Sequence, residues 1–194
     1  MICQAGSYAA GIHLIVEGAV SDVMVTAEGE RRDSNILGPG DLIGLEVLEG
    51  SSDKLSISLC RALTRVELLF VERSLLESAL ENDPVLRQEI LRYSVSRYVL
   101  ARRNPRQQVP AKEQLCCLLL RLGEVCGVPV DGGRSIVLPE EITLRTLGEL
   151  SWLSSRQLRH ARQAIRSLEG SDVGVKFSLD EARQIIDAGL AATD

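Results

Sequence analysis

The stretch RSIVLPEEITLRTLGELSWLSSRQLRHARQAIRSL, residues 134–168, decides the fold of this chain. It opens with the apolar segment 136–138, which predicts a short strand. Thr143 is a typical helix N-cap residue, and leucines recur at three-residue steps after it. Ser154 or Ser155 can cap a second helix by accepting hydrogen bonds from the amides of its first turn. The stretch therefore predicts a strand, a helix, a tight turn and a second helix.

The second of these helices has two unlike faces. At about 100° per residue its apolar side chains fall within one arc and its arginines within a separate one. No Asp or Glu lies between Arg156 and Arg166. A basic helix that follows a helix and a turn is typical of proteins that read the DNA major groove. The alternative is a solvated, arginine-rich surface helix. The apolar set is Leu158, Ala161, Ala164, Ile165 and Leu168, and the basic set is Arg156, Arg159, Arg162 and Arg166.

The chain as a whole is mildly acidic, so its basic character is local. It has 194 residues, of which 45% are hydrophobic, and a formal net charge of −5, which argues against a protein that coats nucleic acid without discrimination. The five cysteines follow no paired framework, and the two histidines offer no zinc-ligand spacing. We therefore expect no metal site, a reducing cytoplasmic location and, since no segment approaches membrane-spanning length, no membrane partner.

Short apolar segments separated by turn residues occupy residues 1–72. The segments 13–16 and 20–25 predict strands, and so does the alternating segment 55–60. The segment 66–71 predicts a more deeply buried strand. Short strands at this spacing indicate a sandwich or a barrel-like roll.

The pattern changes to helical periodicity after this β module. Residues 73–81 and 84–103 predict two helices, and the longer one has two apolar stripes on nearly opposite sides. Such a helix must be covered twice, so we expect one stripe to pack on the β module and the other on the same helix of a second copy. The alternative is a central helix within a monomeric core. The stripes are Leu86, Ile90, Tyr93 and Leu100 on one side, and Leu91, Val95, Tyr98 and Val99 on the other.

Prolines mark a boundary after the two-sided helix. The segment 104–110 contains two of them, which stop the helix and predict a hinge. An apolar helix over 111–126 follows, and beyond residue 168 we expect a hairpin or wing over 173–179 and a terminal helix over 181–190. The predicted division of the chain is a β module over 1–82, a helix and hinge over 83–108, and a DNA-binding domain over 109–194.

In this order the parts resemble the Crp/Fnr family of bacterial transcription regulators. The segment 38–44, GPGDLIG, is similar to the family's G-D-x-x-G turn, and residues 2–20 resemble its first β-roll strands. Residues 113–122 resemble the helix that opens its DNA-binding domain, and 143–158 its helix-turn-helix. The resemblance implies an α+β fold with an N-terminal β-roll (a cupin-like double-stranded roll), a long dimerisation helix and a C-terminal winged helix-turn-helix.

The segment after this turn departs from members of the family that bind cyclic nucleotides. Those members carry Gly-Glu followed by Arg-Ser or Arg-Thr, whereas here Gly44 is followed by Leu45 and no arginine occurs between Gly44 and Arg61. A buried phosphate would lack its guanidinium partner, and Lys54 is the only nearby cation. Cys3 alone cannot supply the cysteine cluster of the iron–sulfur members. We therefore expect an effector other than a cyclic nucleotide and leave any cofactor unidentified.

The helix-turn-helix also departs from the family pattern. The frequent Ser-Arg-Glu-x-x-x-Arg appears here as Ser-Ser-Arg-x-x-x-His over 154–160, so the DNA site need not be the family's usual one. Trp152 stands at the turn position usually held by glycine, where we expect backbone strain.

These patterns predict a sequence-specific transcription regulator that binds double-stranded DNA as a homodimer, with RNA polymerase as a further candidate partner. The alternative is a signalling or interaction protein of this fold whose DNA reader has lost its function. We expect no enzyme, because the sequence has no nucleophile–base pair, HExxH motif or phosphate-binding glycine loop. The predicted DNA-binding residues are Arg145, Arg162 and Arg166 for phosphates, Ser155, Arg156, Arg159 and His160 for base edges, and Ser154 at the start of the reading helix.

Overall fold

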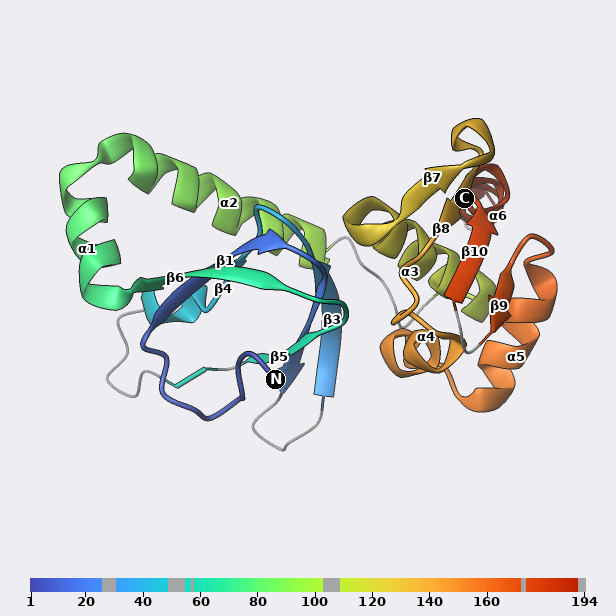
Figure 1. Cartoon of the computed structure of the whole chain (residues 1–194), viewed down its shortest axis with the longest axis horizontal. Helices are drawn as coiled ribbons and strands as arrows, with labels where there is room; N and C mark the ends of the chain where they lie inside the picture. Colours follow the sequence, from blue (N-terminus) through green and yellow to red (C-terminus); the bar gives the residue numbers. More distant parts are fainter. Residues whose placement is uncertain (26–30, 49–54, 57, 103–108, 172–173, 192–194) are drawn as a thin grey trace. The chain divides into compact units, whose positions relative to one another are not determined.

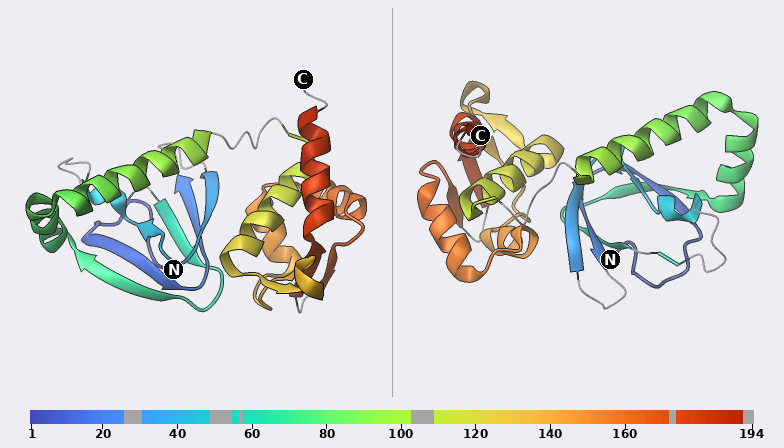
Figure 2. Two further views of the ribbon diagram at one scale, coloured as in Figure 1. Left: turned by 90° about the horizontal axis from the view of Figure 1, so that it is seen from above. Right: turned by 180° about the vertical axis from the view of Figure 1, so that it is seen from behind.

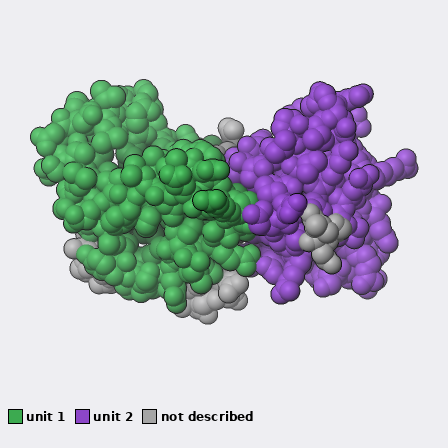
Figure 3. Space-filling model, in the orientation of Figure 1, with its two compact units in different colours: residues 1–105 green, residues 106–194 purple. Residues whose placement is uncertain are grey.

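The computed structural model describes residues 1–25, 31–48, 55–56, 58–102, 109–171 and 174–191. The chain forms two compact units, residues 1–105 and 106–194 (Figure 3). The first is a β-roll with a long helix beside it, and the second is a small helical domain with one sheet (Figure 1).

Two antiparallel three-stranded sheets form the described part of the roll. Their inner faces enclose a buried apolar cluster that includes Ile15, Val20 and Leu37. The first sheet has the order β4-β1-β6, with β4 at Leu42–Ile43, β1 at Gly11–Glu17 and β6 at Glu67–Glu72. The second has the order β3-β2-β5, with β3 at Arg31–Leu37, β2 at Val20–Val25 and β5 at Ser58–Ala62.

Glycine is required directly after β4, at position 44, where the predicted G-D-x-x-G turn ends. Gly44 has φ +89°, and a Cβ there would lie 2.9 Å from the carbonyl oxygen of Gly11. Both the left-handed backbone and this close approach exclude larger residues. The predicted G-D-x-x-G turn is therefore present, and the short 3₁₀ helix η1, Leu45–Leu48, follows it directly.

Two strand predictions are corrected. The segment 66–71 is not deeply buried, because β6 lies at the edge of its sheet and leaves Leu69 54% and Phe70 48% exposed. In the segment 55–60, Leu55 forms only an isolated bridge, and the strand proper is β5; residue 57 lies outside the described residues. The two sequence patterns indicate correctly that a strand forms near each segment. They do not show where the strand begins or whether it lies at the edge of a sheet.

Helices α1, Arg73–Asn82, and α2, Pro84–Arg102, complete the first unit, and α2 lies along the roll (Figures 1 and 2). The predicted exposed stripe is confirmed, and so is the opposite stripe as far as its side chains are described. Leu86, Ile90 and Tyr93 are half-buried on the side that faces the roll. The side chain of Leu100 lies outside the described residues. The opposite stripe is exposed, at 63% for Leu91, 53% for Val95, 59% for Tyr98 and 37% for Val99.

The second unit packs its helices around a core that includes Leu119, Leu147 and Phe177, all fully buried. A four-stranded antiparallel sheet of order β7-β8-β10-β9 completes it. None of the described helices is long and apolar enough to cross a membrane. The helices are α3, Ala111–Cys126; α4, Leu144–Ser151; α5, Ser155–Ala164; and α6, Leu179–Ala191. The strands are β7, Val128–Val130; β8, Ser135–Val137; β10, Gly174–Ser178; and β9, Glu169–Ser171, with the 3₁₀ helix η2 at Asp131–Gly133.

The second helix of the helix-turn-helix ends earlier than predicted. Helix α5 stops at Ala164, and Ile165 takes an extended conformation with φ −103° and ψ 97°. Ile165 and Leu168 are still buried, but as parts of the following turn rather than of the helix. Arg166 therefore does not continue the helical arginine face.

Candidate nucleic-acid interface and roll cavity

Helices α4 and α5 both begin with a capping box. The hydroxyl of Thr143 accepts from the N–H of Thr146, while the Thr146 hydroxyl accepts from the N–H of Thr143. Ser154 and Gln157 make the same exchange at the start of α5. Each box satisfies amides that a helix terminus would leave unpaired, so both helix starts are fixed by sequence-local bonds. The hydroxyl of Ser154 is engaged in this cap.

The turn between α4 and α5 contains the expected strained residue. Trp152 has φ +58° and ψ +14°, in the left-handed region that glycine normally occupies at a helix C-terminus. Its side chain is 43% exposed. The departure from the glycine pattern changes the residue but keeps the backbone conformation of the turn.

The outer face of α5 carries all four predicted base-reading residues. Ala161 is buried and Leu158 half-buried on the inner face, as predicted, whereas Ala164 is exposed and does not join them. Because α5 carries no acidic residue, nothing on the helix itself neutralises its outer face. The exposed side chains of that face are Ser155, Arg156, Arg159 and His160.

The three predicted phosphate contacts lie in different surroundings. Arg162 is exposed on α5, but one of its Nη atoms donates to the carbonyl oxygen of Gly170 at 3.1 Å. Arg145 lies on α4 with an 88% exposed side chain and an ion pair to Glu149 at 3.2 Å. Arg166 is exposed in the turn after α5, where its backbone N–H donates to Glu181 at 2.8 Å. Arg145 and Arg162 thus already have partners within the chain.

A cavity of about 240 Å³ lies between the roll and α2. Two carboxylates line it, Asp22 from β2 and Glu46 from η1, together with Tyr93 and Arg97 from α2. Burial raises the pKa of Asp22, and the nearby charge of Glu46 adds to that effect. Hydrogen bonds from Ser58 and Cys60 and the positive charge of Arg97 oppose it.

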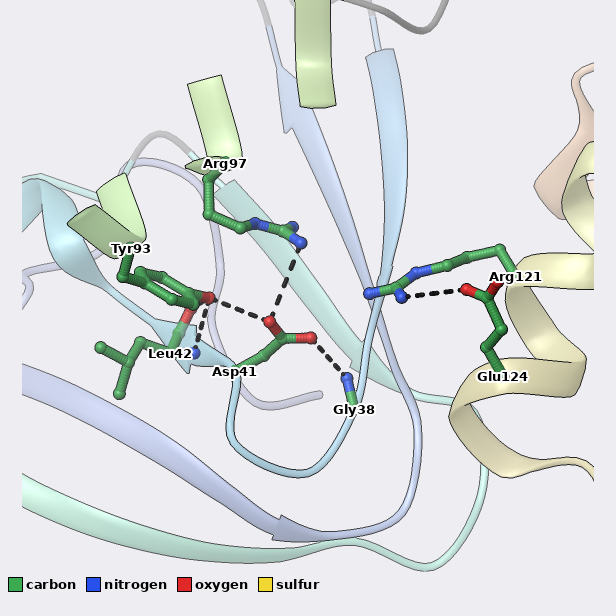
Figure 4. A network of polar contacts seen from close by, with 7 residues as sticks. All are labelled: Gly38, Asp41, Leu42, Tyr93, Arg97, Arg121 and Glu124. Carbon is green, nitrogen blue, oxygen red and sulfur yellow. Dashed lines mark hydrogen bonds and ion pairs between the residues drawn. The ribbon is translucent and has the colours of Figure 1, made fainter. Parts of the chain in front are cut away.

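One carboxylate links the turn before β4 to α2 (Figure 4). Asp41 accepts from the N–H of Gly38 at 2.9 Å and from the Tyr93 hydroxyl at 3.2 Å, and lies 3.8 Å from Arg97. The Tyr93 hydroxyl in turn accepts from the N–H of Leu42 at 2.9 Å. Burial, with the charge of Asp41, raises the pKa of Tyr93 to about 12, so this phenol stays protonated at neutral pH.

The two acids of the cavity were not predicted. The family's carboxylate position aligns with Leu45, whereas the carboxylate that lines the cavity belongs to the next residue, Glu46. Asp22 could have been found, because it lies two residues from the buried Val20 on one strand and therefore points to the same side. Lys54 lies outside the described residues. Among the residues that the structure describes, no group of three or more His, Cys, Asp or Glu side chains is placed to hold a metal ion.

The roll matches a known family model, and the whole chain is similar to solved structures. Residues 1–83 match the family model of the cyclic nucleotide-binding domain. A search of the curated proteins found no sequence match. A transcriptional regulator of the CRP/FNR family from Thermus thermophilus has a similar structure, with a TM-score of 0.75 and 19% identity over 97% of this chain and 94% of that one.

Two further solved structures have a similar fold. FixK2 from Bradyrhizobium japonicum matches with a TM-score of 0.72 and 19% identity, over 97% of this chain and 91% of its own. The c-di-GMP-responsive global regulator CLP from Xanthomonas campestris matches with a TM-score of 0.68 and 15% identity, over 90% and 87%. The chain has the fold of the CRP/FNR regulators, which confirms the resemblance and the α+β class predicted from the sequence.

Proposed function

We propose that this protein is a homodimeric, sequence-specific, DNA-binding transcription regulator. The observation that carries the proposal is the outer face of α5, on which Arg156, Arg159 and His160 are exposed beside one another. Capping boxes fix the start of α5 and of the helix before it, as a rigid reading element requires. The fold shared with CRP/FNR regulators supports the same function.

The predicted DNA-binding residues of α4, α5 and the turn after α5 divide into two kinds of contact. Arg156 and Arg159 can each bond guanine through two parallel hydrogen bonds, and Ser155 and His160 can bond other base edges. Arg145, Arg162 and Arg166 would contact phosphates, which fix the position of the protein but carry little sequence information. Ser154 contributes through its cap, which sets the direction of the first turn of α5.

Selection from a random pool of DNA duplexes tests this function. The purified chain should enrich one motif, and a mobility shift with that motif should give a discrete complex. The Arg156→Ala, Arg159→Ala double variant should lose the enrichment. Arg183→Ala is the matched control, because it removes an exposed positive charge from α6 of the same unit. Failure of the wild-type chain to enrich any sequence would contradict the proposal.

The exposed stripe of α2 supports the homodimer. Leu91, Val95 and Tyr98 are all more than half exposed on a helix whose opposite side faces the roll. If two copies of α2 pack across a two-fold axis, the exposed stripe of each copy is buried against that of the other. In such a dimer the two copies of α5 would address half-sites about one DNA turn apart. RNA polymerase as a partner, and the three-part division at residues 82 and 108, stay predictions.

The described lining of the cavity offers little to hold a cyclic phosphate. Arg97 is its guanidinium, and it already lies 3.8 Å from Asp41. A phosphate placed there would lose its hydration without a guanidinium of its own to pair with. We therefore propose an effector other than cyclic AMP or cyclic GMP, although residues 1–83 match a cyclic nucleotide-binding domain.

Titration calorimetry tests the choice of effector. Neither cyclic AMP nor cyclic GMP should give a saturable signal at about 100 µM, which corresponds to roughly −5.5 kcal/mol of binding free energy. A tighter site for either nucleotide would overturn the proposal. If one appears, Lys54→Ala tests whether that residue has taken over the phosphate.

An interaction protein with a lost DNA reader is the second candidate. The observation that favours it is Trp152, which has a large exposed side chain and a left-handed backbone conformation in the turn directly before α5. Backbone strain at this position would act on the helix that reads DNA. A chain that forms dimers but enriches no sequence from the duplex pool would support this candidate over the first.

A further inference from the structure

Two reduced cysteines lie directly opposite each other in the roll. Cys3 and Cys60 form an antiparallel bridge in which each backbone N–H donates to the other's carbonyl oxygen, at 3.3 and 2.9 Å. Side chains of residues that face each other in this way lie on the same side of the backbone pair. Cys60 is buried in the core of the roll, and the half-buried Cys3 packs against the same cluster.

This placement suits a disulfide. Residues in such a hydrogen-bonded pair have Cα atoms about 5.5 Å apart, which is within the range of about 4.4–6.8 Å found in disulfides. Their Cβ atoms must approach by about 1 Å. Cys3 can supply this shift, because it lies in an isolated bridge and not within a strand. We propose that Cys3 and Cys60 are a redox modification site that closes to an intramolecular disulfide.

Hydrogen bonds connect the two thiols to the acids of the cavity, one directly and one through Ser56. The thiol of Cys60 donates to Asp22 at 3.6 Å. The thiol of Cys3 donates to Ser56 at 3.0 Å, and the Ser56 hydroxyl donates to Glu46 at 2.7 Å. A disulfide has no S–H group, so its formation removes the hydrogen bond from Cys60 to Asp22 and the one from Cys3 to Ser56. Oxidation therefore changes the environment of both cavity carboxylates at once.

A hydroperoxide is the oxidant that this chemistry needs. The sulfur of Cys3 attacks one peroxide oxygen, the O–O bond breaks, and an alcohol or water leaves with a proton, giving a sulfenic acid. The sulfur of Cys60 then attacks the Cys3 sulfur, the S–S bond forms and hydroxide departs. The Cys60 proton passes to the Asp22 carboxylate and then to the hydroxide, which becomes water. Two thiols are oxidised by two electrons, and one peroxide is reduced.

The order of these steps follows from burial. Cys60 is fully buried, and this burial raises the pKa of its thiol well above the ordinary value. Cys3 is half-buried and therefore the more accessible of the two. A buried protonated thiol is a poor first nucleophile but can resolve a sulfenic acid that forms beside it.

Mass spectrometry of the full chain tests the pair. After hydrogen peroxide treatment and alkylation under denaturing conditions, three of the five cysteines should be labelled, and digestion should yield a peptide that joins Cys3 to Cys60. Dithiothreitol should restore the fourth and fifth labels. Cys3→Ser should abolish the cross-link, as should Cys60→Ala, which keeps a small residue in the core. Cys117→Ser, which removes an exposed thiol of the other unit, should leave it unchanged.

Two results would overturn the proposal. One is irreversible over-oxidation of Cys3 with Cys60 still alkylated, and the other is a cross-link that joins Cys3 to any cysteine except Cys60. The coupling to the cavity has its own readout, because the carboxyl carbon resonances of Asp22 and Glu46 should shift on oxidation; unchanged resonances would refute it. Both readouts are independent of DNA binding, so they stand apart from the proposed function.

Discussion

Helices α2 and α5 are both two-sided, but their outward faces have opposite chemistry. Each buries one side against its own unit, α2 through Tyr93 and α5 through Ala161. The outward face of α2 is apolar, with Leu91 and Val95 more than half exposed, whereas that of α5 is lined with arginine. Apolar surface is costly in water, and charged surface is not.

The difference indicates what each face can bind. The stripe on α2 gains free energy when any complementary apolar surface covers it, and the same stripe of a second copy is one such surface. The face of α5 is stable in water alone and gains free energy mainly from a polyanion whose counterions it releases. The proposed dimer would therefore be a permanent partner for the first face, and DNA a transient one for the second.

The largest expected effect comes from placing a charge on the α2 stripe. Val95→Asp would bury an unpaired carboxylate in the proposed interface and should yield monomers. With one reading helix in place of two, affinity for a two-half-site duplex should fall by about 10²–10⁴-fold. Analytical ultracentrifugation and a mobility shift measure the two effects.

Ser96→Asp is the control for this variant. It adds the same charge to an exposed position of α2 outside the stripe, and should leave both the dimer and DNA affinity near wild type. A wild-type chain that is monomeric at micromolar concentration would break the comparison between the two helices, because the α2 face would then need no partner.

The next effect in size concerns base reading by α5. Arg156→Ala should cost roughly 1–3 kcal/mol of binding free energy and relax the base preference at one position of the motif. Competition between the selected duplex and single-base variants measures this. A uniform loss across all variants would instead make Arg156 a phosphate contact.

Strain before α5 should give an effect on stability of about 1 kcal/mol. Trp152 holds φ +58°, a conformation that glycine adopts without the penalty that any Cβ brings. Trp152→Gly should be more stable than Trp152→Ala by about 1 kcal/mol, since both lose the indole but only one keeps a Cβ. Urea unfolding followed by circular dichroism measures the difference, and equal midpoints would show that the turn relaxes.

The smallest effect concerns the salt dependence of binding. Arg166→Ala and Arg162→Ala should each flatten the slope of log affinity against log salt by about 0.9 if each neutralises one phosphate. Arg162 can neutralise a phosphate fully only if it releases its hydrogen bond to the carbonyl of Gly170. The slope of the Arg162→Ala variant therefore tests whether that hydrogen bond persists on DNA. Unchanged slopes in both variants would remove these residues from the interface.

Local sequence patterns were sufficient for most elements of the fold. The bounds of α3 and β2 agree with the predicted segments 111–126 and 20–25, because strong apolar periodicity and flanking glycines act within a few residues. The early end of α5 was missed because it depends on Glu181, which accepts the N–H groups of Arg166 and Ser167 from another helix. No pattern near residue 165 could contain that information.

The candidate sites show the same limit. The exposed face of α5 followed from helical spacing alone, since it needs only one element. The cavity brings together Asp22, Glu46 and Arg97 from a strand, a 3₁₀ helix and α2. The pairing of Cys3 with Cys60 likewise depends on two segments that meet only in the folded roll, so the spacing of the cysteines could not reveal it.

The carboxylate of Asp41 has an evolutionary consequence. It holds the turn through Gly38 and the long helix through Tyr93 and Arg97, so that the turn and the helix share one acid. Loss of the acid alone would leave a half-buried phenol and guanidinium without their common acceptor. Among descendants of this chain, positions 41, 93 and 97 should therefore change together or not at all, while the exposed stripe on the opposite side of the same helix is free to change independently of them.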